Sequence, residues 1–300
     1  MEVPTGFVEA ELNGFYIMTR PVYYDLALDL ARRDPEQALA APEKAGPAGP
    51  MQGRGVRVEL ATETGEILIL KKQRRGGLYG RLMGDIHRSD YRAISEVVLS
   101  ETAWKKGVPV ALLAFAMSAP AGPGRLASYR RGYVASIKVP GARNMMEWLA
   151  DPDCRPERRA VLAAAAHTIN RAHDRGFQHG DMNLGNILVV RSNQGEYSAW
   201  LIDLSHSTLG GTLRFKPRVD NLVRLYRSAE KWLPATDAAA RRGRFRDVVR
   251  FLRAYTGGEK GAVRRVLEAG SRHRTSLFLH RLGWKASRAG SRGGARSYAG

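Results

Sequence analysis

The sequence is poor in cysteine and in long apolar segments. Cys154 is its only cysteine, so no intramolecular disulfide can form, which favours a reducing compartment. The first sixteen residues hold three glutamates and no basic stretch followed by an apolar one, so they do not predict a secretory signal. Apolar runs such as ILIL and VLAAAA are far shorter than the ~20 residues that cross a bilayer. We therefore expect a cytoplasmic protein, either soluble or bound at a membrane surface.

Acidic residues are also scarce. The chain has 48 Lys and Arg against 29 Asp and Glu, a formal net charge of +19. Residues 241–300 alone carry sixteen basic residues and three acids. Such a surface predicts an anionic partner, and nucleic acid, phospholipid headgroups and phosphorylated glycolipids all qualify. A solvated basic surface with no specific partner is the alternative.

The 300 residues, 44% of them hydrophobic, are enough for two lobes with separate cores. Residues 1–50 are predicted as an N-terminal extension that ends in a linker rich in Pro and Gly. Residues 51–140 predict an antiparallel sheet lobe with one key helix over 88–106. Helical periodicity dominates residues 141–285, and the Gly-, Ser- and Arg-rich residues 286–300 are predicted to be a disordered basic tail. The predicted fold class is α+β.

The segment HGDMNLGNIL, residues 179–188, carries the clearest chemical signal. A predicted helix precedes it, an apolar strand follows it, and after a turn a second apolar strand ends at Asp203. This order is typical of the catalytic and metal-binding loops of the protein-kinase-like fold. The spacing predicts Asp181 as the catalytic base, Asn186 and Asp203 as Mg²⁺ ligands, and His179 as a residue that braces the loop. Carboxylate and amide oxygens suit such a hard cation.

A kinase-like site also needs a cradle for the nucleotide in the first half of the chain. Gly53 and Gly55 lie in the first predicted hairpin, where a backbone without side chains can approach phosphate. The strand ILILKK offers a lysine for the phosphates, with Glu96 of the predicted helix as its ion-pair partner. Lys71 is preferred and Lys72 is its rival, since side chains alternate along a strand and only one can face the cleft.

Several longer segments make the resemblance more specific. The chain resembles the lipopolysaccharide kinase family, in particular its 3-deoxy-D-manno-octulosonic acid (Kdo) kinases. The segments that carry the resemblance are GRG at 53–55, LKKQRRGGLYGRLMGD at 70–85, SEVVLSETAWKKGVPV at 95–110, HGDMNLGNIL, LIDLSHS and NLVRLYRSAEK at 221–231. They span about residues 51–255. Generic protein kinases lack the RRGG run and the NLVRLYRS helix.

The resemblance implies a bilobal protein-kinase-like fold and ATP- and Mg²⁺-dependent phosphorylation of a sugar hydroxyl on Kdo-lipid A. It implies a peripheral location at the cytoplasmic face of the inner membrane, where the basic surface meets an anionic leaflet, and no nucleic-acid partner is expected. Arg74 and Arg75 become candidates for binding anionic groups of the acceptor, because a guanidinium matches phosphate and carboxylate; a surface charge pair is the alternative. The oligomeric state and the exact hydroxyl are not determined by the sequence.

The chain departs from the family pattern at three positions. Leu204 and Ser205 follow Asp203, where the family usually has an aromatic residue and then an acidic residue or glycine. Lys71 stands where Kdo kinases often have arginine. Two alternatives are a small-molecule or atypical protein kinase of the same fold and a basic pseudokinase that serves as a binding module. Small-molecule kinases would lack RRGGLYG and NLVRLYRS, and retention of Asp181, Asn186 and Asp203 argues against a pseudokinase.

Overall fold

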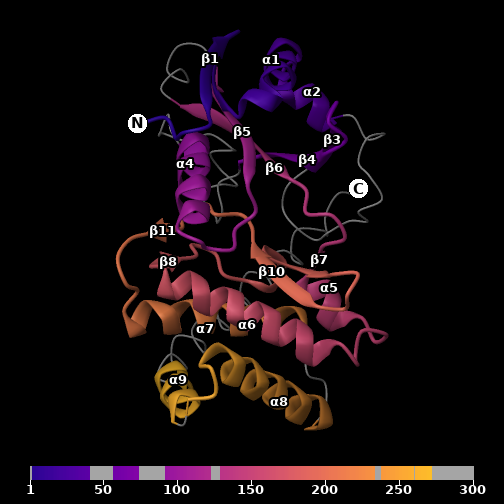
Figure 1. The fold of residues 1–300 in the computed structure, drawn as a ribbon, viewed down its shortest axis with the longest axis vertical. Helices are drawn as coiled ribbons and strands as arrows, with labels where there is room; N and C mark the ends of the chain where they lie inside the picture. The colour runs from indigo at the N-terminus through magenta and orange to yellow at the C-terminus, as the bar shows by residue number, and fades with distance from the viewer. Residues whose placement is uncertain are drawn as a thin grey trace, which may run out of the picture.

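The computed structural model describes residues 2–40, 57–73, 92–122, 129–233, 238–259 and 261–271. The described chain forms two lobes, an N-lobe around an antiparallel sheet and a mainly helical C-lobe (Figure 1). The sheet has six strands in the order β1-β2-β5-β6-β4-β3. Its strands are β1 (Val8–Leu12), β2 (Phe15–Thr19), β3 (Arg57–Ala61), β4 (Ile67–Lys72), β5 (Leu113–Pro120) and β6 (Arg130–Ile137).

Residues 2–40 belong to the N-lobe, which corrects their prediction as an N-terminal extension. β1 and β2 form a hairpin, and β2 pairs antiparallel with β5. Asn13 and Gly14 connect the two strands with φ of 52° and 77°. An Asn-Gly pair with both φ positive is the preferred two-residue hairpin turn, so the sequence did contain a signal for these strands.

Helices cover both faces of the sheet. On one face, α1 (Tyr24–Arg33) and α2 (Pro35–Ala40) pack on alternate strand residues that include Ile17, Leu68 and Leu70. On the other face, α4 (Arg92–Lys105) packs on Met18, Ala116 and Val134. Because side chains alternate along a strand, neighbouring residues of β4 face different helices.

The C-lobe packs its helices around two small sheets and one apolar core. Its strands are β7 (Arg143–Asn144), β8 (Phe177–Gln178), β9 (Ile187–Arg191), β10 (Tyr197–Leu201) and β11 (Thr208–Leu209). Its helices are α5 (Met145–Ala150), α6 (Arg158–Asp174), α7 (Phe215–Trp232), α8 (Ala238–Tyr255) and α9 (Ala262–Ser271), with a 3-10 turn η4 at Leu184–Asn186. Within the described ranges no helix combines the length and apolar character needed to cross a membrane.

The segment between α4 and β5 joins the lobes next to the site. Val110 forms a parallel bridge with Leu201 of β10, and the Leu201 amide donates to the Pro109 carbonyl at 2.8 Å. The Ile202 amide then donates to the Asn186 carbonyl at 3.0 Å. The strand that leads to Asp203 is therefore fixed both to the segment that follows α4 and to the loop of residues 179–186.

Candidate active site

A lysine of β4 connects the two lobes electrostatically. The Lys71 Nζ lies 3.2 Å from the Glu96 Oε1 of α4 and 3.1 Å from the Asp203 Oδ1, which follows β10. The Glu96 side chain is 2% exposed and that of Asp203 40% exposed. Three residues that are far apart in the sequence thus meet where the N-lobe sheet faces the C-lobe.

This geometry keeps Lys71 and Asp203 charged. Burial acts to lower the pKa of Lys71, but the carboxylates of Glu96 and Asp203 outweigh it and raise that pKa. Burial acts to raise the pKa of Asp203, and the Lys71 ammonium outweighs it in turn, so that pKa is lowered. The result is a fixed ammonium beside an ionised, partly exposed carboxylate, which suits the binding of phosphate and of a cation.

Lys72 points to the other face of the sheet. Its Nζ lies 2.6 Å from the Glu36 Oε1 of α2, and the same oxygen accepts a hydrogen bond from the Tyr133 hydroxyl at 2.6 Å. Burial and then the Glu36 carboxylate raise the pKa of Tyr133. The structure therefore brings Lys71, and not Lys72, to Glu96 and Asp203.

Two residues that sequence reasoning did not select hold Glu96 in place. Its Oε2 accepts hydrogen bonds from the Gln73 Nε2 at 2.8 Å and from the Ser205 Oγ at 2.9 Å. Ser205 is one of the two departures after Asp203, and the other, Leu204, is 2% exposed in the core. The departure thus has a structural role, because a serine hydroxyl ties the Asp203 loop directly to α4.

His179 braces the loop through both ring nitrogens. Its Nδ1 lies 3.1 Å from the Asp181 backbone N–H, which can only donate, so the proton belongs on Nε2, 3.0 Å from the Ile202 carbonyl. Burial lowers the pKa of His179 and favours this neutral form. The ring therefore fixes Asp181 relative to the strand that ends at Asp203.

Two asparagines order the loop around Asp181. Asn183 Nδ2 donates to the Asp181 carboxylate Oδ2 at 3.1 Å, while Asn183 Oδ1 caps the η4 turn by accepting from the Gly185 amide at 2.9 Å. Asn186 Nδ2 donates to the Asp181 carbonyl at 2.9 Å. Asn186 is buried, and among the described residues its Oδ1 accepts no hydrogen bond. Asn183 was missed by sequence reasoning, although an Asx residue two positions after Asp181 is a common turn signal.

The loops that carry Asp181 and Asp203 come into backbone contact at Gly180. A Cβ added there would lie 2.4 Å from the His206 carbonyl carbon and 2.5 Å from the Ser205 oxygen. The Gly180 amide donates to the Ser207 Oγ at 2.9 Å. Only glycine permits this approach, and the sequence gives no hint of it apart from the motif itself.

Buried polar residues of three C-lobe helices hold the backbone of the loop that carries Asp181. The Asn221 side chain of α7 accepts from the His179 backbone N–H at 3.0 Å and donates to its carbonyl at 2.9 Å. His173 Nε2 of α6 lies 3.2 Å from the same Asn221 Oδ1, and its Nδ1 lies 2.8 Å from the Tyr255 hydroxyl of α8. Burial lowers the pKa of His173 to about 4. Asn221 lies in the NLVRLYRS segment, so the sequence marked the helix but not this role.

The donors at the site fit Mg²⁺ and a nucleotide. Asp203 offers carboxylate oxygens, and Asn186 offers an amide oxygen whose NH₂ group is already bound to the loop. Hard cations that keep part of their water shell prefer such ligands. No cluster of three or more His, Cys, Asp or Glu that could hold a metal ion occurs among the described residues.

Four predicted site residues cannot be placed. Gly53 and Gly55, expected at the phosphates, and Arg74 and Arg75, expected at the acceptor, lie outside the described residues. Their roles stay predictions.

Comparison with known proteins identifies the family. The model of the lipopolysaccharide kinase (Kdo/WaaP) family matches residues 43–255, and the chain belongs to this family, as its resemblance predicted. A 3-deoxy-D-manno-octulosonic acid kinase of Haemophilus influenzae is 29% identical over 189 residues, which cover 61% of this chain and 75% of that protein. The kinase of the same name from Photobacterium profundum is 30% identical over 190 residues, 61% of this chain and 73% of that protein.

A solved structure supports the fold. The structure titled "WaaP in complex with acyl carrier protein" matches with a TM-score of 0.51 and 20% identity, and the match covers 91% of this chain and 98% of that one. The predicted bilobal protein-kinase-like α+β fold is thereby confirmed. The protein is a lipopolysaccharide kinase, a phosphotransferase with an alcohol group as acceptor.

Proposed function

We propose that the protein uses ATP and Mg²⁺ to phosphorylate a sugar hydroxyl of the lipopolysaccharide inner core, the Kdo of Kdo-lipid A. The observation that carries the proposal is the Lys71 ammonium held between Glu96 and Asp203 in a chain of this family. The names of the relatives support Kdo as the acceptor.

Each residue has a defined part in this proposal. Lys71, held by Glu96, binds phosphate oxygens of the nucleotide as a charged donor. Asp181, oriented by Asn183, lies in hydrogen-bond reach of the incoming hydroxyl and accepts its proton. His179 keeps the Asp181 backbone fixed and transfers no proton, since both ring nitrogens are already engaged.

Asp203 and Asn186 are the residues that would hold the metal. When bound, Mg²⁺ neutralises charge on the phosphate oxygens. Asp203 is suited to hold it because the Lys71 ammonium keeps the carboxyl ionised at every physiological pH. Asn186 contributes its Oδ1, since Nδ2 is engaged with the Asp181 carbonyl.

The proposed acceptor accounts for the basic surface of the protein. Kdo-lipid A carries phosphates and carboxylates and lies in an anionic leaflet, so a chain with net charge +19 is attracted to the place where its substrate is. We therefore include peripheral binding at the cytoplasmic face of the inner membrane in the proposal. Arg74 and Arg75 are proposed to contact the anionic groups of the acceptor.

The test is transfer of labelled γ-phosphate from ATP and Mg²⁺ to Kdo-lipid A, with a generic protein and an aminoglycoside as competing acceptors. Label is expected in the glycolipid alone. Asp181→Ala is expected to lower turnover by about 10²–10⁴-fold and to leave nucleotide affinity nearly unchanged, because the carboxylate acts only on the acceptor. Asp203→Ala is expected to abolish Mg²⁺-dependent nucleotide binding.

Three results would contradict parts of this assignment separately. Full turnover in Asp181→Ala would refute the base, while transfer to the aminoglycoside or the protein but not to Kdo-lipid A would refute the acceptor. Nucleotide binding by Asp203→Ala with the Mg²⁺ dependence of the wild type would refute the metal site.

A further inference from the structure

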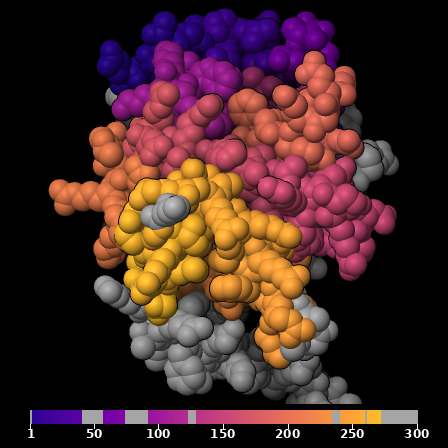
Figure 2. Space-filling view, turned by 60° about the horizontal axis from the view of Figure 1, so that its bottom comes forward, coloured from indigo at the N-terminus to yellow at the C-terminus, as the bar shows by residue number. Residues whose placement is uncertain are grey.

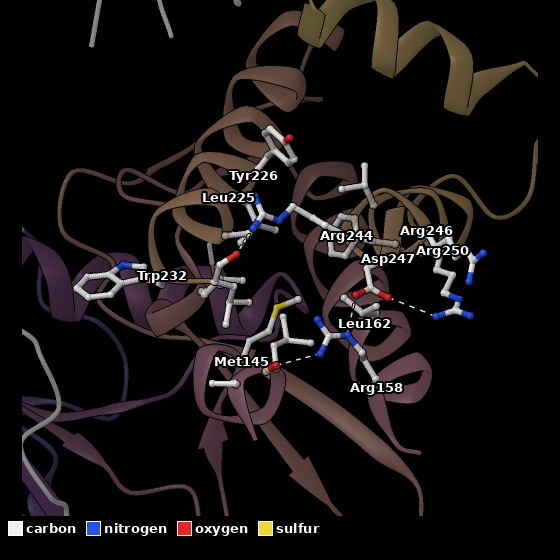
Figure 3. Close-up of a pocket in the computed structure, with 18 of the residues that line it drawn as sticks. Met145, Arg158, Leu162, Leu225, Tyr226, Trp232, Arg244, Arg246, Asp247 and Arg250 are labelled. Atoms are coloured by element: carbon white, nitrogen blue, oxygen red, sulfur yellow. Dashed lines mark hydrogen bonds and ion pairs between the residues drawn. The ribbon is translucent and has the colours of Figure 1, made fainter. Parts of the chain in front are cut away.

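A large groove opens in the C-lobe, and none of the residues assigned to phosphate and metal lines it. It has a volume of about 930 Å³ and lies between α5, α6, α7 and α8 (Figure 3). This is near the upper end of the ~300–1,000 Å³ typical of small-molecule sites. The floor is apolar and consists of Met145, Leu149, Leu162, Leu184, Leu222, Leu225, Phe251 and Leu252. Neither Lys71, Asp181 nor Asp203 lines it.

The polar lining of the groove is almost entirely cationic. Five arginines line it, Arg155, Arg158, Arg244, Arg246 and Arg250, against one carboxylate, that of Asp247. That carboxylate already forms ion pairs within the protein, because it lies 2.6 Å from the Arg158 Nε and 3.3 Å from the Arg250 Nη1 (Figure 3). The groove therefore combines an apolar interior with an excess of positive charge.

Two of the arginines are available to a ligand. Arg155 and Arg246 are exposed, and neither forms an ion pair with another described residue. Phe245, which precedes Arg246 on α8, is 61% exposed, and Tyr226 of the groove wall is 38% exposed. Exposed aromatic rings beside arginines are typical of protein surfaces that lie at the headgroup level of a membrane. Figure 2 shows α8 and α9 on one face of the C-lobe.

The lining restricts the chemistry of the occupant. A small hydrophilic anion would leave the apolar floor exposed to water, and a second copy would bring arginine rims together. Residues 272–300 carry seven Lys or Arg and no acid, so charge disfavours this segment as well. The groove is complementary to a molecule with a long apolar body and an anionic end.

We propose that the groove is a lipid site that holds one acyl chain of an anionic membrane lipid, with the lipid phosphate between Arg155 and Arg246. The guanidinium groups match a phosphate in shape and charge, and their stems extend the apolar wall. This site goes beyond the proposed reaction and does not depend on which hydroxyl is phosphorylated. It would fix the C-lobe to the leaflet through a defined pocket, whereas general basic charge would only attract it.

Gly243 offers a way to close the groove without damage to the fold. It lines the groove on α8, and a Cβ added there meets no atom within 4 Å. Gly243→Trp should therefore place an indole in the open space, and replacing glycine inside a helix favours the helix. Gly243→Ala is the matched control, because it makes the same backbone change without filling the groove.

Two exposed arginines of α8 allow a matched test of the role of positive charge in the groove. Arg246→Gln removes an exposed arginine that lines the groove, whereas Arg242→Gln removes an exposed arginine of α8 that does not. General electrostatic attraction predicts equal effects for the two variants, and the proposed site predicts an effect for Arg246 alone.

The experiment measures binding by calorimetry with the full chain and no nucleotide or acceptor, so its failure is distinct from failure of the kinase assay. The probe is lysophosphatidylglycerol below its micelle concentration, and the comparisons are lysophosphatidylcholine and glycerol phosphate. We expect one lysophosphatidylglycerol per chain, with affinity about tenfold or more above both comparison probes. Gly243→Trp and Arg246→Gln should each weaken it about tenfold, with Gly243→Ala and Arg242→Gln unchanged.

A second readout tests the membrane as the source of the lipid. Wild-type protein should float with phosphatidylglycerol vesicles, and Gly243→Trp should float clearly less than Gly243→Ala. The proposal is overturned if Gly243→Trp binds the probe or the vesicles as well as the wild type, if Arg242→Gln and Arg246→Gln lose affinity equally, or if glycerol phosphate binds as tightly as the lipid.

Discussion

Replacing Gly180 with alanine should impair catalysis severely while the protein stays folded. The new Cβ would lie 2.4 Å from the His206 carbonyl carbon and 2.5 Å from the His206 and Ser205 oxygens, all of them backbone atoms. Ordinary contact begins near 3.4 Å, so the two loops must separate by about 1 Å. That separation would also stretch the bond from the Gly180 amide to the Ser207 Oγ, 2.9 Å in the native structure.

The expected magnitude follows from this displacement. A misplacement of about 1 Å between reacting groups costs about 10²-fold in rate. Gly180→Ala moves the Asp181 loop away from the Asp203 loop, so kcat for transfer to Kdo-lipid A should fall by about that factor. Crowding in the loop should cost about 1–3 kcal/mol of unfolding free energy, which leaves the protein folded.

The assay combines steady-state kinetics with thermal unfolding. Gly210→Ala is the control, because a Cβ at that nearby loop position meets nothing within 4 Å. It should retain wild-type turnover. If Gly180→Ala kept kcat within about threefold of the wild type at unchanged stability, contact between the two loops would not be needed for catalysis and the reasoning would fail.

Three further substitutions test the site and its support. Lys71→Met should weaken nucleotide binding by about 10–100-fold, while Lys72→Met, on the opposite face of the sheet, should stay within about twofold in the same titration. Asn183→Ala should lower kcat and spare nucleotide affinity, because the Asn183 side chain hydrogen-bonds to Asp181 and to the Gly185 amide but not to Lys71 or Asp203; an equal loss of both would contradict this role. In denaturant titrations the wild type should lose unfolding free energy between pH 7 and pH 4.5, and in His173→Gln this loss should be smaller by about 2 kcal/mol. His167→Gln, at an exposed position of the same helix, should keep the wild-type dependence of stability on pH.

The catalytic loops were predictable because their information is local. The order of helix, loop, strand, turn and strand around Asp181, Asn186 and Asp203 lies within about fifty residues. Strand alternation likewise predicts that Lys71 and Lys72 face opposite sides. Which of them meets Glu96 depends on which face α4 covers, and this follows only from packing.

The missed features depend on distant pairs or on shape. β2 pairs with β5 about a hundred residues away, so nothing local marked residues 15–19 as part of the sheet, although the Asn-Gly turn did mark a hairpin. Ser205 meets Glu96 across 109 residues. The lipid-site groove arises from the packing of four helices. The periodicity of apolar residues predicts helices, but it does not predict the space between them.

The buried chain from Tyr255 to Ile202 explains why the C-terminal helices matter to catalysis. Asn221 Oδ1 accepts from the His179 backbone, so His173 must donate to it through Nε2, and its Nδ1 then accepts from Tyr255. The chain has a consistent set of donors and acceptors only when both histidines are neutral and the phenol is protonated. Burial produces this state, since it lowers the pKa of His173 to about 4 and raises that of Tyr255 to about 12.

Protonation of His173 would break this order. Its Nδ1 would become a donor, so the Tyr255 hydroxyl proton would have to turn away from it, and the extra charge would lie on a side chain that is 0% exposed. In the unfolded chain the same histidine takes up a proton near its ordinary pKa of 6.5. Between about pH 6.5 and pH 4 the unfolded state therefore binds more protons than the folded state, so stability rises with pH across this interval and is lost as the solution is acidified. Because the same chain holds the His179 backbone, acid should loosen the catalytic loop through its support.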